Sequence, residues 1–175
     1  MNAAALRLLA VGAHDTVLEV GFGGGGLLDD ILAAGPRLAI GVELSQPMVD
    51  RARQRFGRAI KDGRINVVPG SVYDLPLADD SIDKACSLNT LYFWEQPSKA
   101  LEELARVIRP DGSLILGIEA AESLREWPGH HFGFTLFEPE DVIGFARNAG
   151  FGDAVVHEDV EPQYGKIYCI ELKRQ

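Results

Sequence analysis

A glycine-rich segment near the N-terminus has the residue types and spacing that point most directly to chemistry. Residues 19–26 read Glu-Val-Gly-Phe-Gly-Gly-Gly-Gly and follow a short apolar run. Because glycine has no Cβ, a turn of this kind between a strand and a helix lets the backbone approach a ligand closely. The run Gly21–Gly26 fits the dinucleotide fingerprint G-x-G-x-x-G, and together with Glu19 it also fits E-x-G-x-G-x-G. The segment therefore predicts a loop that binds a nucleoside-bearing cofactor, and it leaves the choice of cofactor open.

A carboxylate at the end of the next apolar run is the second signal. Glu43 follows residues 38–42 and lies 18 positions after Gly25. A carboxylate at this position can accept hydrogen bonds from both hydroxyls of a ribose. A surface glutamate that precedes a helix N-terminus would also be favourable there. The spacing from the glycine loop favours ribose binding.

Short runs rich in Val, Ile and Leu alternate with segments of helical period, and these elements must position both signals. We expect strands at residues 16–20, 38–42, 65–68, 82–87 and 114–118. Helices lie between them, with Ser45 and Ser98 as expected N-caps and Pro139 early in the last helix. Repetition of strand and helix predicts a parallel sheet that has helices on both faces.

The C-terminal part departs from this alternation. Residues 154–157 and 166–173 are both strand-like. The gap of about eight residues between them is too short for a helical crossover, so the two strands should pair as an antiparallel hairpin. Composition shows no linker or repeat, and we expect a single domain over residues 1–175.

The first 15 residues predict one short helix, with Leu6, Leu9 and Ala10 turned inward. They lack a basic leader and the apolar length of a signal peptide or a membrane span. We therefore expect a cytoplasmic protein with no membrane partner.

Composition and charge exclude several classes. The 175 residues are 46% hydrophobic and carry a net charge of −9, with a pI near 4.9. This composition excludes a disordered chain and a disulfide scaffold, and Cys86 and Cys169 fit buried, reduced thiols. Because a surface this acidic repels phosphate backbones, we expect no nucleic-acid partner. The densest basic run, residues 51–64, reads as the solvated side of a helix.

Five segments in order resemble the class I S-adenosylmethionine-dependent methyltransferases, of the small-molecule type seen in quinone-biosynthesis methyltransferases. They are residues 17–25, 41–45, 70–83 and 105–114 and the terminal hairpin. The resemblance implies an α/β fold with a doubly wound, mostly parallel seven-stranded Rossmann-like sheet and a C-terminal antiparallel hairpin. It also implies S-adenosylmethionine as the cofactor and S-adenosylhomocysteine as the product.

The resemblance further implies which residues hold this cofactor. The glycine loop would lie against its methionine part, Glu43 would bind the ribose, and Ser71 and Val72 would lie beside the adenine. The family usually has an aspartate where this chain has Ser71, so a weaker adenine contact is expected. The full expected set is Glu19, Gly21, Phe22, Gly23, Gly25, Glu43, Leu44, Met48, Ser71, Val72 and Asn89.

Two segments could line the pocket of the methyl acceptor. Residues 92–94, Tyr-Phe-Trp, follow the fourth strand and fit core packing equally well. Residues 119–137 form a long loop whose aromatic side chains suit a flat or apolar acceptor. His130 or His131 of this loop could remove a proton, and Tyr92 is a further candidate. Methyl transfer needs mainly alignment, so no catalytic residue is assigned.

A methyltransferase that acts on a small, apolar or aromatic acceptor is the leading interpretation. Asn89 is followed by Thr90 and Leu91, whereas enzymes that act on planar nitrogens tend to have Pro-Pro and an aromatic residue there. No metal is expected, because the adjacent histidines lack further ligands at a suitable spacing. An NAD(P)-dependent oxidoreductase and a non-catalytic cofactor-binding or regulatory subunit are the alternatives. A homodimer is also considered, because residues 1–15 leave little chain for a lid.

Overall fold

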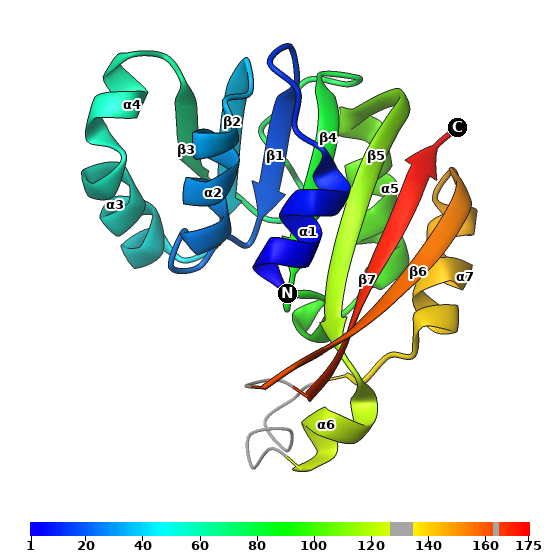
Figure 1. Ribbon diagram of the computed structural model, residues 1–175. Helices are drawn as coiled ribbons and strands as arrows, with labels where there is room; N and C mark the ends of the chain where they lie inside the picture. The colour runs from blue at the N-terminus through cyan, green and yellow to red at the C-terminus, as the bar shows by residue number, and fades with distance from the viewer. Residues whose placement is uncertain (127–134, 163–164) are drawn as a thin grey trace.

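The computed structural model describes residues 1–126, 135–162 and 165–175 (Figure 1). Its strands are β1 (Thr16–Val20), β2 (Leu38–Glu43), β3 (Ile65–Pro69), β4 (Ile82–Leu88), β5 (Ile108–Glu119), β6 (Phe151–Glu161) and β7 (Gly165–Arg174). Its helices are α1 (Asn2–Leu9), α2 (Gly26–Ala34), α3 (Gln46–Arg55), α4 (Gly57–Lys61), α5 (Pro97–Val107), α6 (Ala121–Glu126) and α7 (Pro139–Asn148), with a 3-10 turn η1 at Leu91–Phe93.

The strands form one seven-stranded sheet in the order β3-β2-β1-β4-β5-β7-β6. The pairs from β3 to β5 are parallel, whereas β7 runs antiparallel to both β5 and β6. The predicted fold class is therefore confirmed, including the C-terminal hairpin. Since β1 lies between β2 and β4, the carboxyl ends of these three strands meet at one edge, the lower edge of the sheet in Figure 1.

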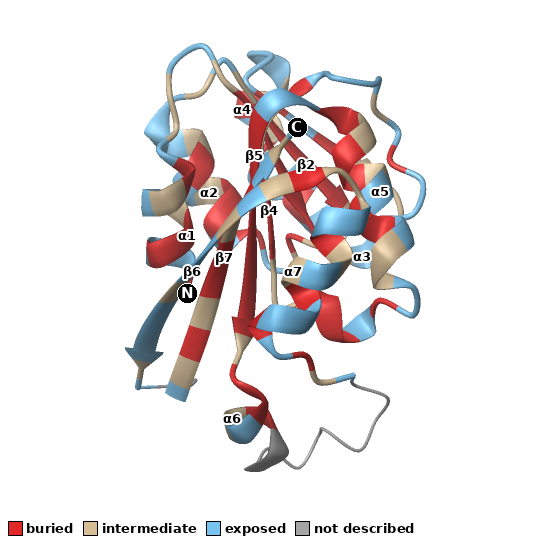
Figure 2. Ribbon diagram, turned by 90° about the vertical axis from the view of Figure 1, so that its right-hand side faces the viewer, coloured by how far each residue is buried: buried red, intermediate tan, exposed pale blue. Residues whose placement is uncertain are grey.

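Helices cover both faces of the sheet, as the apolar strands require. Figure 2 shows the buried strands between two helical layers. One core cluster contains side chains of α1, α2 and α3, and the other contains side chains of α5 and α7. All five residues of β1 are buried, including Glu19. A strand covered on both faces has no polar alternation to show, which is why β1 is mostly apolar and why its Thr16 and Glu19 are buried with the rest.

Several predicted helix ends differ from the structure. Ser98 is not an N-cap, because α5 begins at Pro97 after Gln96, and proline is favoured in the first turn. Ser45 does hold the N-cap position of α3, but its side chain makes no capping hydrogen bond. Ala10 is exposed rather than inward, because the helix ends at Leu9 and Ala10 adopts a left-handed conformation.

Other elements are longer than predicted or were not predicted. β5 begins at Ile108, which pairs with Ile82 before the register shifts. The two hairpin strands also extend beyond their apolar centres, because pairing continues through exposed polar residues. The short helices α4 and α6 had no clear sequence signal, and α6 occupies part of the predicted loop 119–137. In the described part of the chain, no helix is long and apolar enough to cross a membrane.

Candidate active site

A cavity of about 450 Å³ opens where the parallel strands end. Its walls come from the ends of β1, β2 and β4 and from the segments that follow β3 and β4. Adjacent carboxyl ends of a parallel sheet are where ligands of open α/β folds bind. Six residues of the expected cofactor set line the cavity, namely Gly21, Glu43, Leu44, Ser71, Val72 and Asn89.

Gly21 starts the loop after β1 in a conformation that favours glycine. Its φ is +74°, and its N–H donates to the carbonyl of Val42 at 2.8 Å. A Cβ built on Gly21 would lie 2.4 Å from Cγ2 of Thr90, whereas one on Gly23 or Gly24 would meet nothing within 4 Å. The loop is thus tightly packed at its start against the segment that follows β4, and it is open at its middle. An open, side-chain-free stretch of this kind is suited to the close approach of a ligand.

We expect Gly21→Ala to destabilise the protein and to weaken cofactor binding. The positive φ costs an alanine about 1–2 kcal/mol, and the clash with Thr90 adds about 1–3 kcal/mol. Gly63→Ala is the matched control, because Gly63 has a φ of +69° but open space around its Cβ. Denaturant unfolding of both variants separates the two costs. Thr90→Ser removes the clashing methyl group and should partly rescue Gly21→Ala; equal losses in the two glycine variants would refute the clash.

Glu43 ties the glycine loop to the start of α3. Its Oε2 accepts a hydrogen bond from the N–H of Gly23 at 3.0 Å, and its Oε1 accepts one from the N–H of Ser45 at 2.9 Å. Both carboxylate oxygens are therefore oriented, and each retains capacity to accept a second hydrogen bond. This geometry suits a diol such as the two ribose hydroxyls.

Glu19 is a buried carboxyl group beside this loop. It is 5% exposed, and its Oε2 is buried without a hydrogen-bond partner. Burial raises its pKa to about 8, and the nearby carboxylates of Asp30 and Glu43 add to the effect. A buried polar atom of this kind is costly unless something pairs with it. A ligand with an ammonium group would supply such a partner.

The segment after β3 forms the cavity wall opposite the glycine loop. The N–H of Gly70 donates to the carbonyl of Glu43 at 3.1 Å. The hydroxyl of Ser71 accepts from the N–H of Tyr73 at 3.2 Å, and the N–H of Asp74 donates to the carbonyl of Ser71 at 3.1 Å. Ser71 therefore shapes a turn, and both Ser71 and Val72 line the cavity, as expected of residues beside the adenine.

Residues after β4 form the third wall, and the three aromatic residues of this segment divide between two roles. Tyr92 is 3% exposed and lies in the core, where its hydroxyl accepts a hydrogen bond from the N–H of Glu119 and donates to Oδ1 of Asn89 at 3.4 Å. Trp94 lines the cavity from the core side, and Phe93 lines it while 62% exposed. Core packing is thus confirmed for Tyr92, whereas Phe93 and Trp94 line the cavity.

The raised pKa of Tyr92 argues against its role as a base. Burial is the main cause of the shift, and the nearby Glu119 carboxylate adds to it. The phenol therefore stays protonated across the neutral range. Its hydroxyl instead donates to the side chain of Asn89, whose backbone has a φ of +55°.

Some expected residues lie elsewhere, and others were missed. The side chains of Phe22 and Met48 pack in the core cluster behind the loop and do not line the cavity. Glu19 and Gly23 do not line it either. Gly25 is the N-cap of α2. Sequence reasoning missed the cavity positions of Tyr73 and Thr90, although Tyr73 lies within the singled-out segment 70–83 and Thr90 directly follows Asn89.

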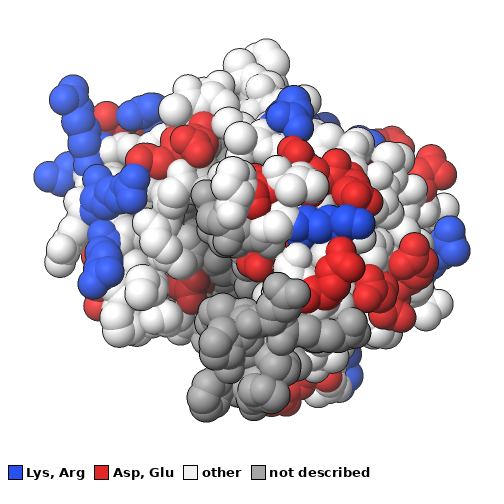
Figure 3. All heavy atoms as spheres, turned by 60° about the horizontal axis from the view of Figure 1, so that its bottom comes forward, with Lys and Arg blue, Asp and Glu red and all other residues white. Residues whose placement is uncertain are grey.

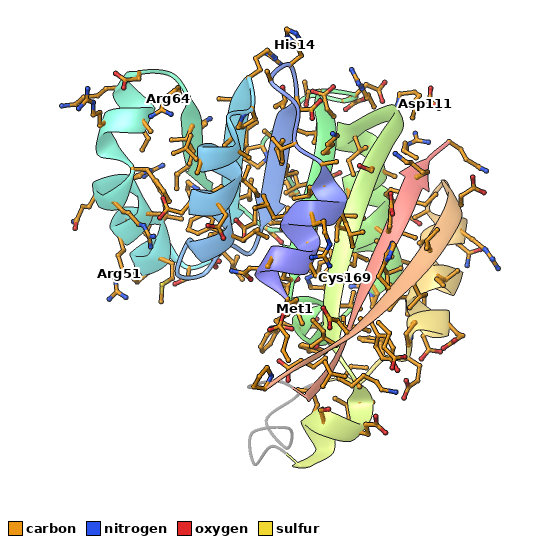
Figure 4. The ribbon with its side chains drawn as sticks, viewed as in Figure 1. Met1, His14, Arg51, Arg64, Asp111 and Cys169 are labelled. Atoms are coloured by element: carbon orange, nitrogen blue, oxygen red, sulfur yellow. The ribbon has the colours of Figure 1, made fainter. Side chains whose placement is uncertain are left out.

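The histidine candidates His130 and His131 lie outside the described residues, as do most aromatic residues of the predicted acceptor loop. His14 is described and lies at the opposite edge of the sheet from the cavity (Figure 4).

Among the described residues, no three His, Cys, Asp or Glu side chains are grouped as metal ligands. Two carboxylates of the segment between β3 and β4 and the start of β4 pair with arginines: Asp79 pairs with Arg106, and Asp83 pairs with Arg109.

The charge on the face of the molecule below the sheet is uneven. In Figure 3, several basic side chains gather at the side of the molecule that carries α3 and α4, and most acidic side chains lie on the other half of this face, with single basic side chains among them. Arg51 and Arg64 lie at this outer side, away from the cavity (Figure 4). Arg55 of α3 turns back to the loop, where it pairs with Asp29 and donates to the carbonyl of Gly24. One residue of the basic run 51–64, Arg55, thus stabilises the glycine loop.

The sheet order, the glycine loop after β1 and the carboxylate of Glu43 at the end of β2 are together typical of a class I S-adenosylmethionine-dependent methyltransferase. The chain belongs to the methyltransferase domain family, whose model matches residues 18–116. This assignment favours E-x-G-x-G-x-G over the nicotinamide fingerprint. The orphaned Oε2 of Glu19 and the open middle of the loop fit the ammonium group and methionine chain of that cofactor.

Comparisons with individual proteins agree with the family. YdaC of Bacillus subtilis, described as an uncharacterized methyltransferase, is 25% identical over 170 residues, covering 95% of this chain and 84% of YdaC. The 27-O-demethylrifamycin SV methyltransferase of Amycolatopsis mediterranei is 30% identical over 110 residues, but these cover 63% of this chain and 40% of that enzyme. The solved structure of an SAM-dependent methyltransferase from Thermotoga maritima matches with a TM-score of 0.78 and 25% identity over 99% of this chain and 87% of that one.

Proposed function

We propose that the protein transfers a methyl group to a small, apolar or aromatic acceptor held at the open side of the cavity. The observation that carries this proposal is the aromatic and apolar rim next to the glycine loop. Phe93 is 62% exposed and Leu44 is 78% exposed, although both line the cavity. Large apolar side chains exposed at the mouth of a pocket indicate a surface that is covered when a ligand binds.

Residues that line the cavity, together with the buried Glu19 beside the glycine loop, have separate parts in this proposal. Glu43 orients the ribose, the segment 70–72 packs on the adenine, and Glu19 neutralises the ammonium group. S-adenosylmethionine supplies, when bound, a methyl group already activated by a positively charged sulfur. The task left to the chain is to align the acceptor and to exclude water, which is worth about 7–11 kcal/mol when the reactants are well oriented.

The acceptor class rests on the charge and shape of this rim. A net charge of −9 disfavours a nucleic acid or another polyanion as acceptor. The rifamycin-modifying relative acts on a small molecule, as its name states, which is consistent with a small acceptor here. The quinone-type acceptor suggested by the sequence remains one member of this class.

A screen of purified protein tests the proposal. Phenols, quinol precursors, amines and carboxylates are offered with S-adenosylmethionine, and formation of S-adenosylhomocysteine is measured. We expect turnover with apolar or aromatic members of the panel. Turnover confined to polar, charged acceptors would contradict the acceptor class while leaving cofactor binding intact.

We expect Phe93→Ala to lower kcat/KM for the best acceptor about tenfold, because the variant loses the aromatic contact area at the rim. The affinity for S-adenosylhomocysteine should change little in the same variant. Val160→Ala is the control, because Val160 is 68% exposed but lies on β6. An unchanged kcat/KM in Phe93→Ala would remove this residue from the acceptor site.

A further inference from the structure

The segment that forms the adenine wall of the cavity is held from behind by an ion pair. Residues 70–81, all of them described, connect β3 to β4 without a helix or a strand. Residues 70–73 line the cavity, and Leu75, only 2% exposed, lies two positions further on. A wall built from irregular backbone needs partners outside itself to keep its position.

Arg106 of α5 supplies most of these partners. Its Nη2 donates to the carbonyl of Leu75 at 3.1 Å, and its Nη1 donates to the carbonyl of Leu77 at 2.9 Å. The same Nη1 lies 2.6 Å from Oδ1 of Asp79. One planar guanidinium therefore contacts three positions along the segment, which the point charge of a lysine could not do.

Glu103, one turn earlier on α5, completes the arrangement. Its Oε1 accepts a hydrogen bond from the N–H of Leu75 at 2.7 Å. Both of its carboxylate oxygens also accept from Arg106, at 2.7 and 2.8 Å. The N–H and the carbonyl of the buried Leu75 are thus both satisfied by a single ion pair, much as a neighbouring strand would satisfy them.

The charge states of the pair favour a permanent contact. The hydrogen bonds from Arg106 hold the pKa of Glu103 below its usual value, and the carboxylates of Glu103 and Asp79 raise the pKa of Arg106. Both groups are therefore charged throughout the neutral range. Glu103 is 15% exposed and Arg106 is 34% exposed, so the pair is partly shielded from solvent.

We propose that Arg106, acting with Glu103, is a positioning residue for the cofactor: it fixes the segment 71–79 so that Ser71 and Val72 present a preformed wall to the adenine. Arg106 itself does not line the cavity. The inference rests on the assignment of this cavity to the cofactor. It goes beyond that assignment because Arg106, a residue of α5 outside the cavity, would then contribute to the affinity for adenosine.

Hydrogen exchange of the ligand-free protein tests the support directly. Arg106→Met retains an unbranched apolar stem and removes the guanidinium. We expect the amide of Leu75 and its neighbours up to residue 79 to exchange at least about tenfold faster, the scale set by loss of one net hydrogen bond. Arg109→Met is the matched control, because Arg109 pairs with Asp83 outside the cavity. Unchanged exchange of the segment in Arg106→Met would overturn the proposal.

Calorimetry then tests the link to the cofactor. In Arg106→Met we expect the dissociation constants of S-adenosylhomocysteine and of adenosine to rise by the same factor, about tenfold, because both ligands carry the adenine. Arg106→Lys should recover part of the loss, and Arg109→Met should bind within twofold of the wild type. A purely structural role would lower the thermal midpoint of Arg106→Met without changing either dissociation constant.

The possible failures are distinguishable. If the wild type binds S-adenosylhomocysteine and Arg106→Met binds it equally well, the positioning role is wrong and the cofactor site stands. If the wild type itself binds neither S-adenosylhomocysteine nor adenosine, the assignment of the cavity is wrong, whatever the exchange rates show.

Discussion

Glu43→Ala is expected to weaken the binding of S-adenosylhomocysteine by about 1.5–3 kcal/mol, which is the value of charge-assisted hydrogen bonds. The structure adds a second reason, because Glu43 also accepts from the N–H groups of Gly23 and Ser45. Its removal therefore takes away the ribose contact and loosens the glycine loop. Isothermal titration calorimetry measures the change, and Glu102→Ala, an exposed glutamate on α5, is the control.

A ligand cycle separates these two contributions. Adenosine and 2′,3′-dideoxyadenosine are titrated into the wild type and into Glu43→Ala. If Glu43 binds the ribose, loss of the two hydroxyls should cost the wild type much more affinity than it costs the variant. Equal costs in the two proteins would show that Glu43 acts on the loop alone. An unchanged affinity in Glu43→Ala would remove both roles.

Glu19→Gln is expected to change the pH dependence of stability. The pKa of Glu19 is raised to about 8 in the folded protein and is near 4.5 when the group is exposed. A raised carboxyl pKa means that the folded state binds the extra proton, so this stabilising contribution is complete below pH 4.5 and is lost as the pH rises toward 8. Between pH 5 and pH 8, the variant should gain about 3 kcal/mol in unfolding free energy relative to the wild type.

The range from pH 5 to pH 8 separates the contribution of Glu19 from those of Asp15 and Glu103. Asp15 and Glu103 have lowered pKa values, so their contributions are lost only as the pH falls below about 4 to 4.5. Urea unfolding at several pH values measures the difference between variant and wild type. A constant difference from pH 5 to pH 8 would contradict the raised pKa of Glu19.

The proton released on cofactor binding is a second measurable property that depends on Glu19. If the ammonium group of the ligand pairs with the Glu19 carboxylate, binding at pH 7 must release a proton from the wild type. Calorimetry in buffers of different ionisation enthalpy detects this proton. We expect release by the wild type and none from this position in Glu19→Gln, together with weaker binding by the variant. Equal proton release by both proteins would place the ammonium group elsewhere.

The parts of the fold predicted from sequence are those fixed by local pattern. The apolar runs became β1 to β5 because both faces of these strands are covered, and the short C-terminal gap allowed only a hairpin. Gly21 and Glu43 were brought to one cavity because β1 and β2 are neighbours and run parallel. These inferences needed only strand direction and order.

The parts that sequence could not predict depend on contacts between distant segments. The turn η1 buries Tyr92 and exposes Phe93, because the hydroxyl of Tyr92 meets Glu119 at the end of β5. No local pattern reveals that partner. The role of Arg106 is hidden for the same reason, since its partners Leu75 and Leu77 lie about 30 residues earlier in a segment without regular structure.

A structure of the protein crystallised with S-adenosylhomocysteine tests the central claim most directly. The account predicts that the ligand lies in the cavity at the carboxyl edge of β1, β2 and β4. Its ribose hydroxyls should be on Glu43 and its adenine against Ser71 and Val72. A ligand bound elsewhere, or one in this cavity with its ribose turned away from Glu43, would contradict the account.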